Sequence, residues 1–329
     1  MEMTRKNGLP RPSYKAKERV KRVVWAVLRS VFVAGFCFII LYPVINMISR
    51  SLMSPVDLYD NTILWLPKHV TADNFRVVAA VLDYGRAALN SALMTVGATL
   101  LQTMACVMAG YGFARFHFRG KNLLFACVIL TLVVPPQLIM LSTYMHFRFF
   151  DFFGIIGSIT GQGGLNLLDT PWPMLLLAAT GNGIKNGLFI FIFRQFFRGM
   201  PRETEEAALV DGAGYRRTFF QIMLPDARTA VVTVVLFSVV WQWNDVYYSS
   251  LFFKNFEVLP LMYEKLRAMS DAVIVKTVPL LAKYNLYDPV IRANFNSTGV
   301  LLIILPLLVF FLIMQRNFVE SIERSGLVG

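Results

Sequence analysis

The sequence predicts an all-α polytopic membrane protein with six transmembrane helices. Of its 329 residues, 56% are hydrophobic and 16% are charged, a composition that favours a membrane protein over a soluble one. Inside the hydrocarbon every backbone polar group needs an internal hydrogen-bond partner, which leaves helices or a closed barrel. The apolar runs favour helices, because about 20 helical residues cross roughly 30 Å of hydrocarbon.

Six apolar segments are long enough to span a bilayer. They lie near residues 24–48, 89–113, 123–144, 173–193, 230–251 and 298–318. Eight basic residues precede the first segment, as in a signal peptide, but it is too long for a signal-peptide core and lacks a small-x-small cleavage site. We therefore expect a retained first span.

The distribution of Lys and Arg predicts the orientation. An even number of spans puts both termini on one side of the membrane. The two tails and the loops after the second and fourth spans hold 19 of the 32 basic residues when Arg316, near the end of the sixth segment, is counted with the C-terminal tail, whereas the opposite loops hold 11. This excess predicts a basic cytoplasmic N-terminal tail at 1–23, a transmembrane domain at 24–318 and a cytoplasmic C-terminal tail at 319–329.

Two long loops are then expected on the outer side. The loop at 145–172 is rich in Gly and Asp, which predicts an ordered or semi-ordered external loop. The loop at 252–297 mixes aromatic, charged and Asn residues and is expected to form short interfacial helices. Its length lowers its weight in the charge count.

Several other classes of function are disfavoured. The net charge of +12 does not predict a nucleic-acid partner, because the basic residues are spread over loops without a DNA- or RNA-binding motif. Cys37, Cys106 and Cys127 lie in apolar segments and are expected to be small buried hydrophobes. The three histidines lie on different loops, so we expect neither a metal site nor His-based catalysis.

The loop at about 200–226, between the fourth and fifth spans, predicts a helix–turn–helix. Pro201 suits the first turn of a helix, and the glutamates that follow it complement the positive end of the helix dipole. Gly212 and Gly214 permit a left-handed turn that ends this helix. A second short helix is expected to run to Pro225, where a new helix starts toward the fifth span.

Ala207 and Ala208 predict a small-residue surface on the first of these helices. Another protein can approach such a surface closely, and the flanking carboxylates can meet its basic or backbone donors. The alternative on physical grounds alone is an ordinary amphipathic cytoplasmic loop, since helix–turn–helix pieces are common.

The spacing within this loop resembles a known family. Glu206-Ala207-Ala208, three residues, Gly212, nine residues, Ile222, one residue and Leu224-Pro225 resemble the EAA signature of binding-protein-dependent ABC importer permeases. Further segments resemble the carbohydrate branch of this family, especially permeases of the maltose-transporter type. They are Phe193-Arg-Gln-Phe-Phe-Arg-Gly-Met-Pro, Asp211-Gly212-Ala213, Val134-Pro135-Pro136-Gln137 and Trp243-Asn244-Asp245.

This resemblance implies a coupling helix that is seated in a cleft of a cytoplasmic ATPase. The implied ATPase-coupling residues are Glu205, Glu206, Ala207, Ala208, Asp211, Gly212, Ile222, Leu224 and Pro225. It also implies a bacterial cytoplasmic membrane, a second and usually non-identical permease, two copies of the ATPase and an external solute-binding protein. The C-terminal tail resembles tails that reach the ATPase interface.

The chain itself is not expected to be an enzyme. It contains no G-x-x-x-x-G-K-[ST] sequence to hold nucleotide phosphates, so ATP and its Mg²⁺ are expected on the partner ATPase and no cofactor on this chain. An integral membrane enzyme is also disfavoured, because no convergent acid–base or metal set is present.

Polar residues inside spans are the candidates for the translocation path, because they are costly unless they face a cavity or another helix. These candidates are Asn90, Gln102, Gln137, Asn182, Lys185, Asn186, Trp241, Trp243, Asn244, Tyr247 and Tyr248. Aromatic rings beside amides suit sugars, whose C–H faces pack on rings while their hydroxyls need hydrogen bonds.

Each of these candidates has a structural alternative. The two tyrosines also fit an aromatic belt at the outer interface. Asn90 and Gln102 also fit interhelical hydrogen bonds. Lys185 is expected to face either a carboxylate or the cavity, and the proline pair at 135–136 to disturb its helix, lining the path or only kinking it. The glycines around Lys185 allow close helix approach or a local break.

The cargo implied by the resemblance is a carbohydrate, more specifically an oligosaccharide. The alternatives are import of an amino acid, peptide or polyamine, or a membrane scaffold or sensor that recruits a soluble partner without transport.

Overall fold

The computed structural model describes residues 14–63, 65–161, 163–255, 257–270, 278–279, 281, 284–285 and 287–326. In this part of the chain the structure is helical, and its only β pairing consists of two isolated bridges, Met53 with Val70 and Phe150 with Leu165. The predicted all-α class is therefore confirmed. The N-terminal tail before residue 14 and the last three residues of the C-terminal tail lie outside the described residues.

The chain forms two compact units. The first contains the residues up to Asn74 together with Pro289–Thr298, and the second contains Phe75–Asp288 together with the residues from Gly299 onward. α1 (Tyr14–Ser51) and α2 (Pro55–Leu58) belong to the first unit. α3 (Asp73–Leu82) and α17 (Pro289–Gly326) each contribute residues to both units.

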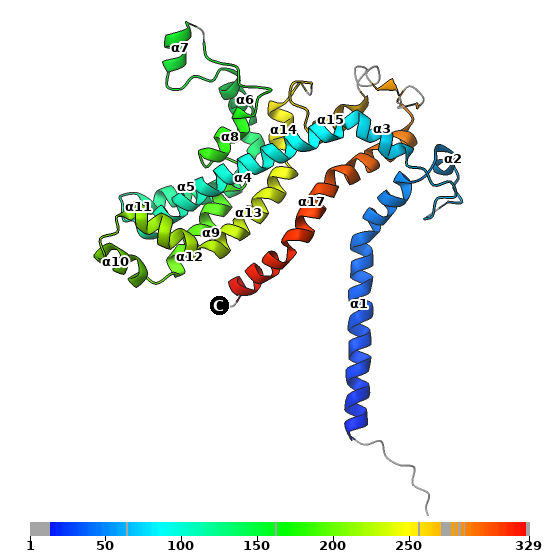
Figure 1. Cartoon of the computed structure of the whole chain (residues 1–329), viewed down its shortest axis with the longest axis horizontal. Helices are drawn as coiled ribbons and strands as arrows, with labels where there is room; N and C mark the ends of the chain where they lie inside the picture. The colour runs from blue at the N-terminus through cyan, green and yellow to red at the C-terminus, as the bar shows by residue number, and fades with distance from the viewer. Residues whose placement is uncertain are drawn as a thin grey trace, which may run out of the picture. The chain divides into compact units, whose positions relative to one another are not determined.

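The second unit contains most of the helices (Figure 1). In chain order they are α4 (Tyr84–Arg115), α5 (Lys121–Val133), η1 (Pro136–Ile139), α6 (Met140–Arg148), α7 (Ile155–Thr160), α8 (Trp172–Ala179), α9 (Asn186–Gly199), α10 (Glu203–Val210), α11 (Tyr215–Thr218), η2 (Phe219–Met223), α12 (Leu224–Asp226), α13 (Arg228–Trp243), α14 (Tyr247–Phe252), α15 (Met262–Arg267) and η3 (Ala268–Ser270).

Among the described residues, three helices are continuous and apolar enough to cross a membrane. They are Glu18–Ser51 of α1, Tyr84–Arg115, and Pro289–Gln315 of α17, which contain the predicted first and second spans and most of the predicted sixth span. Two further candidates are helix pairs with a sharp bend. Lys121–Val133 and Pro136–Arg148 meet at 101°, and Tyr215–Asp226 and Arg228–Trp243 meet at 74°.

The predicted spans three, four and five are therefore not continuous helices. The third bends at the proline pair, the fourth is interrupted between α8 and α9, and the fifth is interrupted between α13 and α14. In each case the interruption coincides with Pro, Gly or Asn, which end helices by losing an N–H or by adopting non-helical dihedral angles. The short helix α15 confirms the expected helical structure in the loop at 252–297.

The core of the second unit is built on α4, which packs against α8, α9 and α13. Gly110 lets α4 and α9 approach closely. A Cβ atom added there would lie 3.0 Å from the backbone nitrogen of Arg194 and 3.2 Å from the carbonyl oxygen of Ile190. Phe189, Phe193 and other buried apolar residues fill the layer between these helices and α13.

In the first unit, the loop after α1 is fixed by buried polar groups. The carboxylate of Asp57 accepts hydrogen bonds from the backbone N–H of His69 and lies 2.7 Å from its Nδ1. Burial raises the pKa of Asp57, but the hydrogen bonds and charge of His69 outweigh it and lower the pKa below its usual value. Asn74 donates to the carbonyl oxygens of Ser51 and Met53.

The expectation for the cysteines was wrong for two of the three. Only Cys106 is buried in the protein, whereas Cys37 and Cys127 are exposed on α1 and α5. Both exposed thiols lie on helices whose outer surfaces are apolar, so an apolar segment does not by itself predict burial within the protein. In a spanning helix the lipid provides an equally apolar environment.

Candidate functional site

The loop between α9 and α13 contains a helix with a well-defined end. The helix α10 starts with three glutamates in its first turn and ends at Val210. Gly212 follows in the left-handed region with φ of 82°. Its N–H donates to the carbonyl oxygen of Leu209, and the N–H of Ala213 donates to that of Ala208. These two bonds form a Schellman motif.

This motif explains the spacing between Ala208 and Gly212 in the sequence. In a Schellman motif the residue four positions before the left-handed glycine receives the outer hydrogen bond, and it also packs against the residue that follows the glycine. Ala208 and Ala213 occupy these two positions. The predicted left-handed turn at Gly212 is therefore confirmed.

Three details of the loop differ from the expectations. Gly214 is extended, with φ of −70°, because it is the N-terminal flanking residue of α11. Pro201 precedes α10, which begins at Glu203 after Arg202. Ala208 is buried and packs inward, so of the alanine pair only Ala207 is exposed. A helix presents about half of its circumference to a neighbour, and adjacent residues cannot share one narrow face.

Side-chain contacts anchor Glu205 to the end of α4. Its Oε1 accepts a hydrogen bond of 2.6 Å from the hydroxyl of Tyr111, and its Oε2 lies 3.4 Å from Nε of Arg115. The Arg115 guanidinium also donates to the carbonyl oxygen of Met200 at 2.9 Å. The side chains of Glu205 and Arg115 are 12% and 6% exposed, so this ion pair is largely shielded from solvent.

An aromatic cluster lies beneath the loop. The ring of Tyr111 contacts those of Phe116, Phe197 and Phe219, with centroid separations of 5.5, 5.3 and 4.9 Å. These residues come from the end of α4, the end of α9 and the second part of the loop. The loop is therefore joined to two membrane helices by packing as well as by the Glu205 ion pair.

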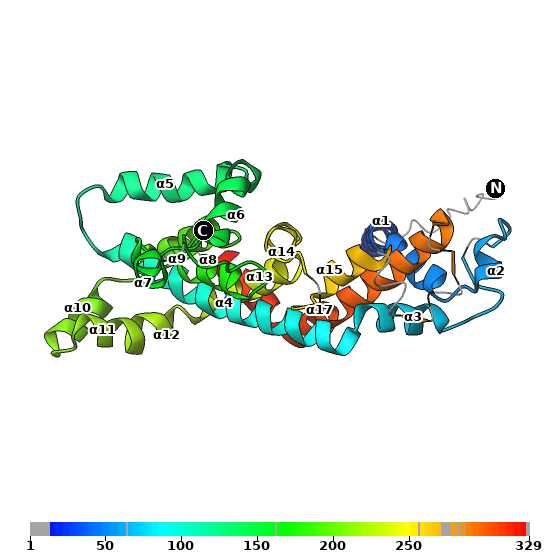
Figure 2. The same ribbon diagram turned by 90° about the horizontal axis from the view of Figure 1, so that it is seen from above.

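The remaining loop residues divide into exposed and packed sets. Glu206, Ala207, Asp211 and Gly212 are exposed, and next to them Val210 is 87% exposed. Figures 1 and 2 show α10, α11 and α12 at one end of the second unit, with α14 and α15 at the other end. The exposed set is thus presented away from the body of the unit.

The second part of the loop continues directly into α13. A π-helical turn at Phe219–Met223 follows α11, and α12 carries Pro225 in its first turn. Ile222 and Leu224 are partly buried, and Pro225 is exposed. The second short helix runs through Pro225 to Asp226, and the new helix α13 starts at Arg228 after a bend of 74°, so the predicted start at Pro225 was three residues too early.

The fourth apolar segment is broken by a second Schellman motif. Gly181, with φ of 76°, donates to the carbonyl oxygen of Ala178, and Asn182 donates to that of Leu177. Lys185 is also left-handed, with φ of 59°, immediately before α9 begins. Both expected roles of the glycines occur. Gly181 breaks the helix, and Gly187 allows close helix approach, because a Cβ atom added to it would lie 2.8 Å from the carbonyl oxygen of Val128 in α5.

Lys185 faces an aromatic ring. Its Nζ lies 4.7 Å from the ring centroid of Trp241, a cation–π contact between the break before α9 and the helix α13. None of the ion pairs found among the described residues includes Lys185. Lys185, Trp241 and Asn182 are exposed on the surface of the second unit.

The proline pair bends the third segment as expected. The carbonyl oxygen of Pro136, in the 3₁₀ turn after the bend, accepts a hydrogen bond of 2.7 Å from the hydroxyl of Tyr247. One carbonyl near the bend is thus satisfied by a side chain of α14. The neighbouring Gln137 is exposed.

Gln102 is the centre of a buried polar network. Its Nε2 donates to the carbonyl oxygen of Ile184 and to Oδ1 of Asn186. Its Oε1 lies 2.7 Å from the hydroxyl of Ser238 and accepts a bond of 3.1 Å from Nε2 of Gln242. All of its hydrogen-bonding groups are used within the protein, so Gln102 and Asn186 hold α4, α9 and α13 together.

The remaining candidates have individual partners. Asn90 donates to the carbonyl oxygen of Pro260, and the ring nitrogen of Trp243 donates to that of Ile303 at 3.0 Å. Asn244 is exposed and donates to Val240 within its own helix. Tyr248 stacks on Phe252, with ring centroids 5.8 Å apart. Asn90, Trp243 and Tyr248 are therefore occupied by contacts within the unit.

Residues 103–324 match the family described as "Binding-protein-dependent transport system inner membrane component". The chain belongs to this family.

The chain is also similar in sequence to individual permeases. The chain is 25% identical over 273 residues to "Probable starch degradation products transport system permease protein AmyC" of Thermoanaerobacterium thermosulfurigenes, covering 83% of this chain and 86% of that protein. It is 24% identical over 317 residues to "Arabinooligosaccharides transport system permease protein AraQ" of Halalkalibacterium halodurans, covering 94% and 100%.

The fold also resembles that of a solved transporter. A chain of "a bacterial ABC transporter involved in the import of the acidic polysaccharide alginate" superimposes with a TM-score of 0.67 and 18% sequence identity. The match covers 94% of this chain and 100% of that chain. At this level of identity the likeness concerns the fold alone.

Family membership decides between a transport subunit and an enzyme. The predicted ABC importer permease is confirmed, and in such importers ATP is hydrolysed by a separate ATPase. The alternative of a non-transporting scaffold is not supported. Among the described residues no group of three or more His, Cys, Asp and Glu side chains is arranged to hold a metal ion.

Several residues that fix Glu205 or complete the network of Gln102 were not predicted from the sequence. Tyr111 and Arg115 fix Glu205, and Ser238 and Gln242 complete the network of Gln102. A faint signal exists for Arg115, which is a charged residue at the end of an apolar run. No local pattern pairs it with Glu205, ninety positions further along, because that pairing depends on how α4 packs on α9.

Proposed function

We propose that this permease forms half of the translocation pathway of an ATP-driven importer for carbohydrates. The names of similar permeases support a sugar cargo, since they refer to starch degradation products and arabinooligosaccharides. Six spans, with α8 and α9 together forming the fourth, and cytoplasmic termini agree with the excess of basic residues.

The observation that carries this proposal is the way α10 is built into the membrane core. Its exposed face offers Glu206, Ala207 and Asp211, while its buried face is held by Glu205 and Ala208. A helix that an ATPase can grip must transmit force without moving independently of the spans. The ion pair of Glu205 with Arg115 supplies that connection, because separating a shielded ion pair leaves an uncompensated charge and costs about 3–5 kcal/mol.

The proposed partners follow from this arrangement. The ATPase binds the exposed face of α10, and it carries the ATP and Mg²⁺. One ATPase copy serves this permease and another serves a second, similar permease that completes the pathway. A solute-binding protein delivers the sugar on the opposite side of the bacterial cytoplasmic membrane, where α14 and α15 lie in this orientation.

Exposed and partly buried candidates are proposed to line the pathway. Trp241 presents an exposed aromatic ring, the partly buried Tyr247 presents a second ring, and Gln137, Asn182 and Asn244 present exposed amides. Rings and amides together suit a carbohydrate, which has apolar C–H faces and hydroxyls. Lys185 holds its ammonium over Trp241 and thereby restricts the orientation of that ring.

Uptake in proteoliposomes tests this proposal. The permease is reconstituted with its partner permease, ATPase and solute-binding protein, and ATP-dependent uptake is measured for a panel of oligosaccharides and amino acids. Trp241→Ala is expected to reduce sugar uptake roughly three- to tenfold, the value of one aromatic contact. Trp25→Ala is the matched control, because Trp25 is 69% exposed on α1 and is not among the candidates.

The outcomes separate the alternatives. Uptake of a sugar that falls with Trp241→Ala and not with Trp25→Ala supports the proposal. Uptake of an amino acid, peptide or polyamine in place of every sugar tested would transfer the chain to the non-sugar branch of the family. Equal uptake by the two variants would remove Trp241 from the pathway.

A further inference from the structure

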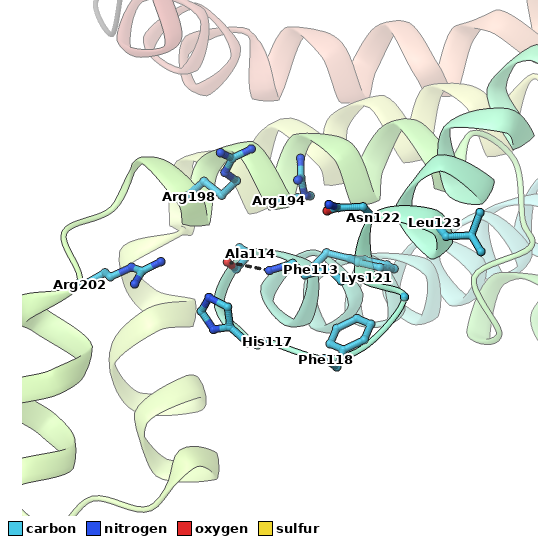
Figure 3. Close-up of a pocket in the computed structure, with 11 residues that line it drawn as sticks. Phe113, Ala114, His117, Phe118, Lys121, Asn122, Leu123, Arg194, Arg198 and Arg202 are labelled. Atoms are coloured by element: carbon cyan, nitrogen blue, oxygen red, sulfur yellow. Dashed lines mark hydrogen bonds between the residues drawn. The ribbon is translucent and has the colours of Figure 1, made fainter.

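A cavity of about 630 Å³ lies where the end of α4, the turn into α5 and the end of α9 meet. Figure 3 shows Arg194 and Arg198 on one side of it, opposite the turn that carries His117 and Phe118, with Arg202 at its left edge. The residues that determine its chemistry are Lys121, Arg194, Arg198, Arg202, Phe118 and Leu123. This volume is within the usual range for pockets that hold small molecules, about 300–1,000 Å³.

The positive charge of this basic cavity is not balanced by the protein. Its described lining contains three arginines, one lysine and no Asp or Glu. None of the ion pairs among the described residues includes Lys121, Arg194, Arg198 or Arg202. Because these cations are held around one space, an anion placed there would relieve their mutual repulsion.

Arg194 supplies an independent observation. Its guanidinium lies over the ring of Phe125, with the central carbon 3.9 Å from the ring centroid, which fixes its plane. Its Nε is buried and has no hydrogen-bond partner among the described residues. A buried donor without a partner costs about 1–3 kcal/mol, so a missing acceptor is indicated.

Two general effects account for basic residues near this position, but not for the cavity. Cytoplasmic ends of spans carry excess Lys and Arg, and cations complement the C-terminal end of a helix such as α9. Both effects operate on solvated side chains. Neither explains why Nε of Arg194, a residue that lines the cavity, is buried without a hydrogen-bond partner among the described residues.

The walls of the cavity distinguish a lipid from a soluble anion. Leu123 is 71% exposed and Phe118 is 43% exposed beside the charged groups. From Leu123 the apolar surface continues along α5 through Leu124, Leu130 and Val133, all more than half exposed. A phosphate with an attached acyl chain matches this combination, whereas a free phosphate would leave the apolar side uncovered.

We propose that this basic cavity binds the phosphate headgroup of an anionic phospholipid of the inner leaflet, with an acyl chain along α5. The arginines suit this ligand, because their planar guanidinium groups bind phosphate oxygens in pairs. Arg202 directly precedes α10, so the bound lipid stabilises the start of that helix. The choice of leaflet rests on the proposed function, which puts the loop in the cytoplasm.

Lipid retention by the purified transporter tests this site. The complete complex is exchanged from detergent into nanodiscs of phosphatidylcholine with a small fraction of phosphatidylglycerol, and tightly held lipid is counted by native mass spectrometry. The wild type is expected to retain phosphatidylglycerol in preference to phosphatidylcholine. Arg198→Gln with Arg202→Gln is expected to weaken this retention at least about tenfold, since two charge-assisted hydrogen bonds are removed.

Two controls separate the site from general charge. Arg119→Gln with Arg216→Gln removes the same charge from exposed residues that do not line the cavity, and it is expected to retain lipid normally. Arg198→Lys with Arg202→Lys keeps the charge without the paired geometry and is expected to fall between the wild type and the glutamine variant. The wild-type preference is measured without any substitution, so it remains informative if a variant misfolds.

Several results would overturn the proposal. These are equal retention of the two lipids by the wild type, equal loss in both double-glutamine variants, and displacement of the lipid by millimolar inorganic phosphate alone. Loss of ATPase binding with unchanged lipid retention would instead make the cavity a protein-docking surface. Lipid retention is measured without transport, so a failure of sugar uptake would count against the proposed function and leave the lipid result standing.

Discussion

Gly212 and Gly214 are two residues apart in the loop between α9 and α13, the proposed coupling loop, yet their backbone conformations differ. Gly212 has φ of 82° and ends α10, whereas Gly214 is extended with φ of −70°. Neither has another heavy atom within 4 Å of the position that a Cβ would occupy. Within this chain, any effect of a substitution at either glycine therefore arises from its backbone conformation and not from a clash.

Gly212→Val is expected to impair coupling while the complex still assembles. A β-branched residue in the left-handed region costs about 1–2 kcal/mol, which loosens the end of α10. The measurement is the stimulation of ATPase activity by the sugar-loaded binding protein in proteoliposomes. Gly214→Ala is the control and is expected to behave as wild type. Normal stimulation in the Gly212→Val complex would contradict a role for this turn in coupling.

Glu264 in α15 is a buried carboxylate with an incomplete set of partners. Its Oε2 accepts bonds from Arg267, at 2.7 and 3.0 Å, whereas its Oε1 is buried with no partner among the described residues. Burial raises the pKa of Glu264 above its usual 4.5, and the bond and charge of Arg267 oppose this only in part.

The raised pKa of Glu264 predicts a pH-dependent stability. Ionisation is harder in the folded than in the unfolded chain, so the stabilisation is complete below pH 4.5 and is lost as the pH rises through the folded-state pKa. Thermal unfolding in detergent across this range measures the slope. Glu264→Gln is expected to flatten the slope, and Glu257→Gln, at an exposed position of the same loop, to preserve it. An unchanged slope in Glu264→Gln would assign the titration to another group.

Among single residues, some backbone conformations were predictable from the sequence and others were not. The turn at Gly212 was predictable, because its spacing from Ala208 is that of a local hydrogen-bond motif. The left-handed Lys185 was not, because a non-glycine residue in that region costs free energy that only tertiary contacts compensate. Its contact with Trp241 joins positions far apart in the chain.

At the scale of elements, α4 and α9 are the closest pair in the second unit. Gly110 permits this approach, and its absent side chain is replaced by atoms of Arg194 and Ile190. The basic cavity and the aromatic cluster under the coupling loop both lie at the end of this pair. Correct packing of α4 on α9 therefore determines the geometry of both sites.

Gly110→Ala is expected to lower the stability of the permease. The added methyl group overlaps the backbone of α9, and such overpacking costs about 1–3 kcal/mol, more than the 0.5–1 kcal/mol gained by alanine in a helix. The midpoint of thermal unfolding in detergent is the measurement. Gly112→Ala is the matched control, since its nearest new neighbour is 4.0 Å away, and its midpoint is expected to stay or rise. Equal midpoints would show that the two helices move apart at little cost.

The sequence predicted which segments are apolar and long enough to be spans better than it predicted whether each span is one continuous helix. The first, second and sixth spans are single helices, whereas the third, fourth and fifth contain breaks. The break at the prolines was foreseen, because proline removes a helical hydrogen bond wherever it occurs. The break after Trp243 was not, because Asn244 and Asp245 are compatible with a helix and act as its end only when Asp245 accepts the N–H groups of Tyr248 and Ser249.

At the scale of the whole molecule, the orientation in the membrane remains a prediction. It depends on 19 basic residues against 11, and the opposite side includes a long loop of lower topological weight. Phe153 and Val210 are suited to a direct test, since they are 89% and 87% exposed and lie in loops assigned to opposite sides.

Cysteine labelling in intact cells is expected to distinguish the two loops. Cys37, Cys106 and Cys127 are first replaced by Ser or Ala, and the ATPase is left out of the strain so that it covers neither loop. A membrane-impermeant maleimide is expected to label Phe153→Cys from outside and Val210→Cys only after permeabilisation. The reverse pattern would invert the topology and move the coupling loop away from the ATPase.

The break between α8 and α9 has a mechanical consequence. A continuous helix transmits both translation along its axis and rotation about it. A helix with a break transmits rotation less well, because the dihedral angles at the break can change. α9 is joined to the end of α4 by the contact of Phe197 with Tyr111, and the two left-handed residues Gly181 and Lys185 lie in the break between α8 and α9. If an ATPase acts on the loop as proposed, we expect α9 to rotate more than α8, and Trp241, which contacts Lys185, lies beside the break between them.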